Sequence, residues 1–75
     1  MREIAPRITV DQDTRFGRPV IQGTRIPVDL VVAKLATGLS VEEICAEYGI
    51  EREDVLAALA YAARALADEQ VRATH

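Results

Sequence analysis

The sequence has little with which to build a metal centre, a disulfide or a catalytic site. Its 75 residues include one cysteine, Cys45, and one histidine, His75. A single cysteine cannot form an intrachain disulfide, and these two residues cannot supply a tetrahedral zinc site. Glycine-rich phosphate loops, Cys-x-x-Cys pairs and His-Glu-x-x-His motifs are also missing. We therefore expect a protein that is not an enzyme and that holds no metal or cofactor.

Long apolar runs are missing too. No stretch approaches the roughly 20 apolar residues that span a bilayer, and the N-terminus lacks the apolar core of a signal peptide. The lone cysteine suits a reducing compartment. These features predict a cytoplasmic protein that does not associate with membranes.

The chain is short enough that a partner is expected. Its length allows one domain, and a chain of about 60 to 75 residues buries a modest fraction of its surface. Small domains are usually stabilised by disulfides, a metal or oligomerisation. Because the first two are excluded here, the sequence favours a homodimer.

Charge is distributed unevenly along the chain. The formal net charge is −3, but it divides into +1 over residues 1–29 and −6 over residues 40–69. The first segment holds five of the nine basic residues, and the second has eight acidic residues against two basic ones. The two halves are therefore expected to meet different partners.

Residues 1–28 are expected to form a small β element. Short strands are predicted at residues 8–10, 20–21 and 25–28, because β-branched residues alternate there between Gly- and Pro-containing turns. Strands this short are not stable by themselves. Candidate residues for structure or dimer contacts lie here, namely Val20, Ile21, Gly23, Thr24, Ile26 and Pro27.

Residues 29–69 are expected to form three helices, and residues 70–75 a frayed tail. The first helix runs from Val28 or Asp29 to Ala36, where apolar residues recur at spacings of three and four. The third runs from Arg52 to Glu69, is rich in alanine and is suited to pairing with a second copy. Its predicted buried face comprises Val55, Leu56, Leu59, Ala62, Ala63 and Leu66.

The second helix has a clear start and stop. Ser40 followed by Glu43 is a capping box, and Gly49 ends the helix after about two turns. Cys45 falls on the apolar face and is expected to be a small core residue. The sequence from Leu39 to Leu56 fits two helices joined by a glycine-containing turn, the pattern of a helix-turn-helix.

Two sets of charged residues are candidates for binding partners. Arginines that could contact DNA phosphates are Arg7, Arg15, Arg18, Arg25, Arg52 and Arg64. Residues that could contact a partner protein are Glu42, Glu43, Glu47, Tyr61 and Arg64. Arg25 could instead pair with Asp29 or Glu53, and Tyr61 could either anchor an interface or cover the edge of the core.

The motifs resemble a known bacterial family. The runs Gly17-Arg-Pro-Val-Ile-Gln-Gly-Thr-Arg-Ile-Pro-Val28, Ala36-Thr-Gly-Leu-Ser-Val-Glu-Glu-Ile44 and Asp54-Val-Leu-Ala-Ala-Leu-Ala-Tyr-Ala62 are similar to the "domain of unknown function 433" family over roughly residues 8–66. The resemblance implies a mostly α fold, with a homeodomain-like helix-turn-helix of three helices after a small β element. Glu51 departs from the Ser or Thr typical of the family at that cap.

The resemblance also implies a function. Members resemble VapB-type antitoxins, which are paired with PIN-like toxins. We therefore expect an antitoxin-like protein of a type II toxin–antitoxin system that neutralises a PIN-like ribonuclease and binds operator DNA. The alternatives are a stand-alone helix-turn-helix transcriptional regulator and an interaction module that does not bind DNA.

Overall fold

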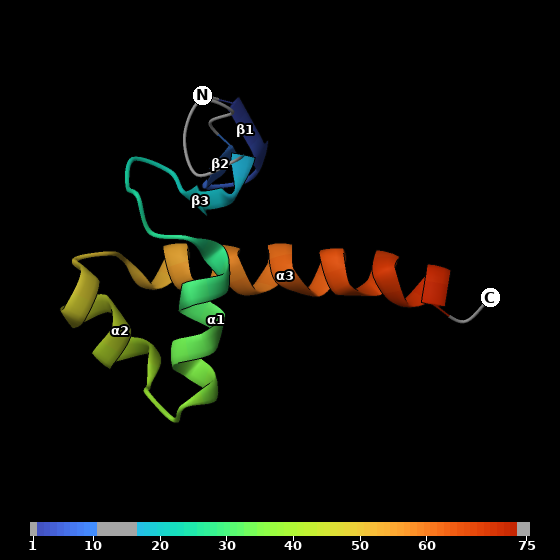
Figure 1. Ribbon diagram of the computed structural model, residues 1–75. Helices are drawn as coiled ribbons and strands as arrows, with labels where there is room; N and C mark the ends of the chain where they lie inside the picture. Colours follow the sequence, from blue (N-terminus) through green and yellow to red (C-terminus); the bar gives the residue numbers. More distant parts are fainter. Residues whose placement is uncertain (1, 11–16, 74–75) are drawn as a thin grey trace.

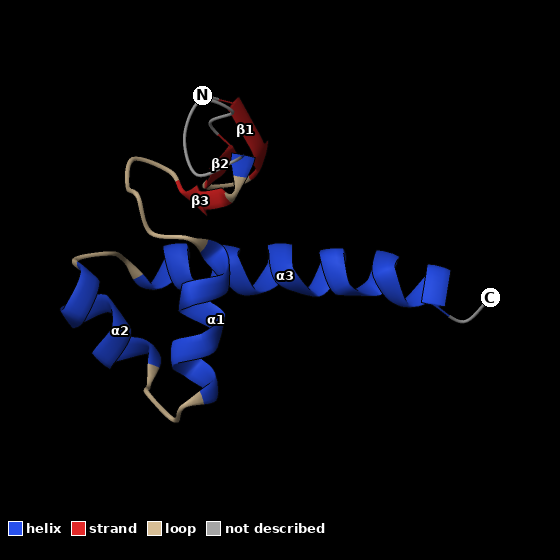
Figure 2. Ribbon diagram, in the orientation of Figure 1, coloured by secondary structure: helices blue, strands red, loops and turns tan. Residues whose placement is uncertain are grey.

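The computed structural model describes residues 2–10 and 17–73, with side chains of the last helix described up to Asp68. The elements, in chain order, are β1 (Arg2–Ala5), β2 (Ile8–Val10), β3 (Pro19–Ile21), α1 (Val28–Ala36), α2 (Val41–Tyr48) and α3 (Arg52–Ala73). Three helices therefore follow a small N-terminal β element, as predicted (Figure 2).

The strands form one antiparallel sheet in the order β1-β2-β3. Ile8 pairs with Ile21 and Val10 with Pro19, which places the two isoleucines side by side. The strand at Arg2–Ala5 was not predicted, because its residues show no alternating pattern and it is held by pairing with β2. The strand predicted at 25–28 is wrong: there is one isolated bridge, between Val20 and Pro27, and helix α1 has already begun at Val28.

A tight corner joins β3 to α1. Gly23 adopts a φ of +78°, a conformation that a side chain would disfavour. The Thr24 hydroxyl donates to the Ile21 carbonyl at 2.8 Å and accepts from the Ile26 amide at 3.0 Å. Pro27 then leads into α1 with a φ of −68°. The Gly-Thr-Arg-Ile-Pro segment is thus built to turn the chain from the sheet into the first helix.

Helix α2 is capped at both ends. The Glu43 amide donates to the Ser40 hydroxyl at 3.1 Å, and the Ser40 amide donates to the Glu43 carboxylate at 2.8 Å, which completes the predicted capping box. Gly49 takes the left-handed conformation, with a φ of +67°, and its amide donates to the Cys45 carbonyl at 2.9 Å. Both predicted boundaries of this helix are confirmed.

The capping box predicts a dependence of stability on pH. The backbone amide of Ser40, and then its hydroxyl, lower the pKa of Glu43, because both hydrogen bonds favour the carboxylate. A lowered pKa in the folded state means that the stabilisation is complete above about pH 4.5 and is lost as the pH falls below it. Thermal melts between about pH 6 and pH 3 should therefore show a smaller loss of stability for Glu43→Gln than for the parent. Equal slopes would contradict this role.

Helix α3 differs from its prediction in length and in buried face. It continues to Ala73, so the tail expected to fray at 70–75 is helical up to that residue. Val55 and Ala58 are fully buried, whereas Leu56, Leu59 and Leu66 are 45%, 37% and 59% exposed. The helix carries two apolar stripes, and the one with the smaller residues packs on the body. Small side chains let α1 and the sheet approach the helix closely, which leaves the leucines outside.

The core lies where the sheet and the first two helices meet the N-terminal half of α3. In Figure 1 the sheet lies above that half of α3 and α1 and α2 lie below it, while the rest of α3 extends beyond them. Every element contributes to this core, and β1 does so through Ile4 and Ala5, which are half-buried and pack against it. The buried apolar cluster comprises Ile8, Ile21, Val28, Val31, Ile44, Ile50, Val55 and Ala58.

Candidate partner-binding site

An acidic surface covers α2 and the start of α3. It comprises Glu42, Glu43, Glu47, Glu51 and Glu53, all of them exposed. Glu42 and Glu51 keep 80% and 72% of their side-chain surface accessible even though each lies within reach of an arginine. Four of these carboxylates lie at helix N-termini, where the helix dipole favours them, whereas Glu47 lies in the last turn of α2 and lacks this stabilisation.

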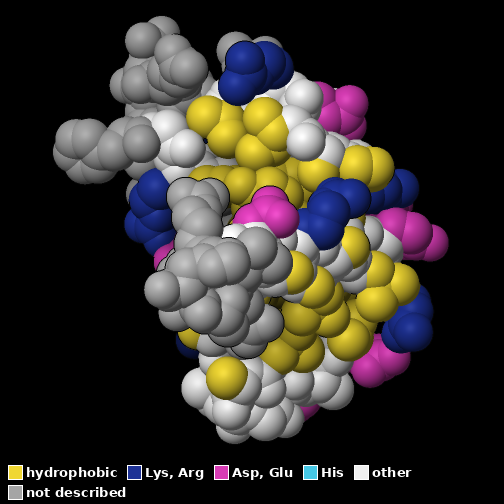
Figure 3. Space-filling model, turned by 90° about the vertical axis from the view of Figure 1, so that its right-hand side faces the viewer, with side chains coloured by type: hydrophobic (Ala, Val, Ile, Leu, Met, Phe, Trp, Pro, Cys, Tyr) yellow, Lys and Arg dark blue, Asp and Glu magenta, His cyan; other side chains and the backbone are white. Residues whose placement is uncertain are grey.

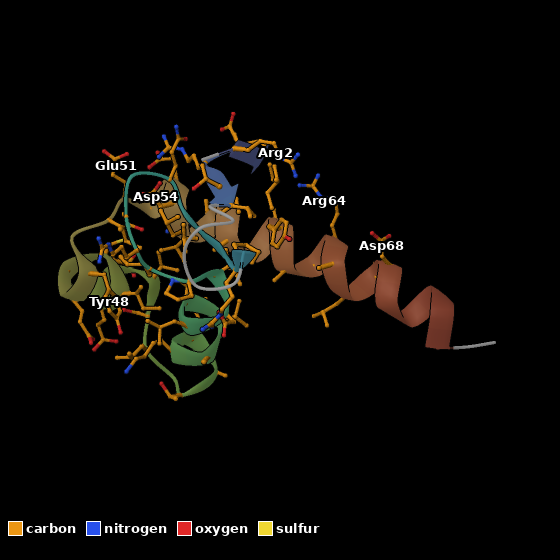
Figure 4. All side chains as sticks on the ribbon, turned by 45° about the horizontal axis from the view of Figure 1, so that its top comes forward. Arg2, Tyr48, Glu51, Asp54, Arg64 and Asp68 are labelled. Atoms are coloured by element: carbon orange, nitrogen blue, oxygen red, sulfur yellow. The ribbon has the colours of Figure 1, made fainter. Side chains whose placement is uncertain are left out.

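Arg7 connects the β1–β2 turn to the start of α3. Its guanidinium Nη1 lies 2.9 Å from Asp54 Oδ1 and 3.3 Å from Glu51 Oε1 (Figure 4 labels both acids). Hydrogen bonds to Asp54 and then to Glu51 raise the pKa of Arg7. The other carboxylate oxygen of Asp54 accepts from the Glu51 amide at 3.0 Å, so it also caps α3. Arg7, expected from the sequence to contact DNA, is thus held by two acids of its own chain.

Loss of this connection should loosen the sheet from the helices. Arg7→Ala removes both ion pairs and leaves Asp54, which is 15% exposed, without its cation. We expect a lower melting temperature, measured by circular dichroism, and a smaller decrease for Arg18→Ala, since the partner of Arg18 is 71% exposed. A melting temperature for Arg7→Ala equal to that of the parent would show that the two ion pairs are dispensable.

The other arginines that were expected to contact DNA lie on separate elements of the structure. Arg18 forms an ion pair with Asp29 at the start of α1, and the hydrogen bond to that acid raises the pKa of Arg18. Nη1 of Arg52, at the start of α3, lies 3.7 Å from Oε2 of Glu42, in the first turn of α2. Arg25 is exposed and takes part in none of the ion pairs between described residues, so neither pairing considered for it is present. Arg15 lies outside the described residues.

Arg64 lies on another side of the molecule from the acidic surface. It is exposed on α3, and Asp68 lies one turn further along the same helix (Figure 4). Arg64 and Asp68 line a shallow hollow of about 360 Å³ between β1 and α3, together with Tyr61. Arg64 therefore does not join Glu42, Glu43 and Glu47 in one binding surface.

Tyr61 and Cys45 both lie against the hydrophobic core. Both are half-buried and pack against the core cluster. Tyr61 lies at the edge of the core rather than standing free as an interface anchor. Cys45 is a small core side chain, as its position on the apolar face of α2 predicted.

The residues considered for dimer contacts are mostly internal. Val20 and Ile21 are 6% and 0% exposed and belong to β3, and Pro27 is buried beside them. Ile26 is half-buried and packs against the core. Gly23 and Thr24 shape the corner described above. Side chains that fill the core of one chain are not available to an interface, so the side chains of Val20, Ile21 and Pro27 have a structural role.

The surface that sequence reasoning missed is apolar. A groove of about 460 Å³ runs between α1 and α3, and its walls include Pro19, Val32, Ala62 and Leu66. Figure 3, which faces the side toward which α3 extends, shows hydrophobic side chains gathered on this side of the molecule. The sequence signal was present in the leucines of α3, but they were assigned to the core of the chain itself.

The described part of the chain lacks a metal site and a membrane-spanning helix. No group of three or more His, Cys, Asp or Glu side chains there is arranged to hold a metal ion. None of the described helices is long and apolar enough to cross a membrane.

The fold defines a class: a small, mostly helical domain with a three-stranded antiparallel sheet at its N-terminus. Residues 8–62 match the family model described as "Protein of unknown function (DUF433)", and the chain belongs to that family. No curated protein and no solved structure matches the chain.

Proposed function

We propose that this protein is the antitoxin-like component of a type II, VapBC-like toxin–antitoxin pair, and that it binds and neutralises a PIN-like ribonuclease. The observation that carries the proposal is the acidic surface of α2 and the start of α3. Glu47 and Glu53 are exposed there and join none of the ion pairs between described residues, so their charge is available to a partner. The likeness of the Gly-Thr-Arg-Ile-Pro-Val motif to the family supports the same assignment.

The mechanism follows from charge complementarity. A surface of five exposed carboxylates attracts a basic protein, accelerates its approach and orients it. Nucleases present basic residues around the site where the phosphate backbone of RNA is bound. An acidic protein that covers such a site excludes the substrate without any chemistry of its own. Binding in the cytoplasm to the newly made toxin would then hold the nuclease inactive.

Operator DNA is a second partner in this proposal. The helix α2, the turn at Gly49 and helix α3 have the order of a helix-turn-helix, and a homeodomain-like arrangement would place α3 against the DNA. The acidic start of α3 opposes this, because the exposed Glu51 and Glu53 would face phosphates. Arg2, Arg25 and Arg64 are exposed cations, and Figure 4 shows Arg2 and Arg64 away from Glu51 at the start of α3, so they are better placed to contact the backbone of the duplex.

Co-expression with the neighbouring PIN-like gene tests the proposal. The two proteins should co-purify as a stable complex, and growth arrested by the toxin alone should be restored. Failure of both, with each protein shown to be folded, would reject the antitoxin function.

Mobility shifts on the promoter of the operon test the DNA partner separately. Direct reading by the start of α3 requires that Arg52→Ala abolish the shift. Contact through the N-terminal half requires that Arg18→Ala and Arg25→Ala weaken it more. Absence of any shift together with toxin binding would identify an interaction module that does not bind DNA.

A further inference from the structure

An exposed row of apolar side chains runs along α3. We define the leucine seam as Leu56, Leu59, Ala63 and Leu66, which follow one another at spacings of three, four and three residues. The three leucines are 45%, 37% and 59% exposed, and Ala63 is exposed as well. The core uses a different face of the helix, represented by Val55 and Ala58, which are fully buried. The seam is therefore apolar surface that the chain itself does not cover.

The spacing of the seam identifies what kind of element would cover it. Alternating intervals of three and four residues are the a and d positions of a helical heptad, the row through which two helices pack in a coiled coil. Helix α3 has 22 residues, about 33 Å of length. Its C-terminal half extends past α1, α2 and the sheet (Figure 1), so a second helix has open access to it.

We propose that the occupant is α3 of a second copy of this chain, packed antiparallel in a symmetric dimer. Antiparallel pairing about a twofold axis near Tyr61 sets Leu59 of one chain opposite Ala63 of its partner, so that a large side chain meets a small one. Leu56 and Leu66 face each other at both ends of the contact. The seam is thus complementary in size to its own reversed copy.

The neighbours of the seam also suit a second helix. The positions that flank it are Ala60, Ala62 and Ala67, which allow two helix axes to approach to about 8 Å, the short end of the usual range. Antiparallel helices also bring opposite dipole ends together. A parallel pair would instead place the two acidic surfaces side by side and bring together the bodies that surround the N-terminal halves (Figure 1).

The groove between α1 and α3 extends the same interface. Leu66 belongs both to the seam and to the wall of the groove, next to Val32 and Ala62. An antiparallel partner helix would therefore run from the seam onto the apolar face seen in Figure 3. This interface leaves the acidic surface of α2 free, and the inference does not depend on the proposed toxin.

Sedimentation of the purified chain tests the dimer. The parent should sediment as a dimer at micromolar concentration, and Leu59→Glu and Leu66→Glu should each weaken association at least tenfold. Leu66 is 59% exposed and lies beyond the core, so its replacement should leave the circular dichroism spectrum unchanged. Arg64→Glu introduces the same residue outside the seam and should remain dimeric. A monomeric parent, or seam variants that associate like the parent, would overturn the proposal.

Disulfide cross-linking tests the orientation. In a Cys45→Ser background, a Leu59→Cys chain mixed with an Ala63→Cys chain should give the mixed 59–63 disulfide in preference to either homodimer. Efficient 59–59 and 63–63 disulfides from the single variants would instead show a parallel arrangement and would contradict the register proposed here.

Discussion

Ile44→Ala is expected to lower the free energy of unfolding by about 3 kcal/mol, because a fully buried side chain is replaced by a cavity. Ile44 is the one fully buried residue of α2 and joins that helix to the core cluster. In a domain of this size 1 kcal/mol corresponds to about 4–8 °C. The melting temperature should therefore fall by about 12–24 °C, as measured by circular dichroism at a fixed protein concentration.

A matched control lies on the same helix. Glu47 is exposed, and Glu47→Ala keeps good helix propensity while removing no core contact, so its melting temperature should stay within a few degrees of the parent. Equal melting temperatures for Ile44→Ala and Glu47→Ala would show that Ile44 does not anchor α2 to the core. The acidic surface would then not be held on a rigid helix.

Reversal of charge on the acidic surface should have the largest effect on function. The double variant Glu42→Lys with Glu47→Lys replaces two exposed carboxylates by cations that would face a basic toxin. Like charges across an interface cost several kcal/mol, and each 1.4 kcal/mol is tenfold in affinity. We expect affinity for the toxin to fall about 100-fold or more in calorimetry, and rescue of growth to be lost.

The control for this experiment carries the same change in net charge elsewhere. Glu3→Lys with Asp68→Lys alters exposed acids on β1 and on α3, away from α2. This variant should keep affinity within a few-fold of the parent at physiological salt. Unchanged affinity of the Glu42, Glu47 variant would place the toxin on another surface, whereas equal losses in both variants would show that net charge alone decides binding.

Local signals in the sequence were sufficient for much of the fold. The capping box at Ser40, the glycine stop at Gly49, and the bounds of α1 and α2 follow from interactions within one or two helical turns. The strands at residues 8–10 and 20–21 follow from alternation of β-branched residues. The acidic character of residues 40–69 is also kept on the surface after folding, because five of their carboxylates are exposed, namely Glu42, Glu43, Glu47, Glu51 and Glu53.

Contacts between distant residues decided the rest. Strand β1 forms because it pairs with β2, and its own residues show no alternating pattern that would predict a strand. Arg7 was a candidate for DNA contact until folding brought it to Asp54, 47 residues further along the chain. The choice between the two apolar stripes of α3 could not be read from periodicity, since both have helical spacing. Close packing against α1 and the sheet selected the stripe of smaller residues, and that selection leaves the leucines on the surface.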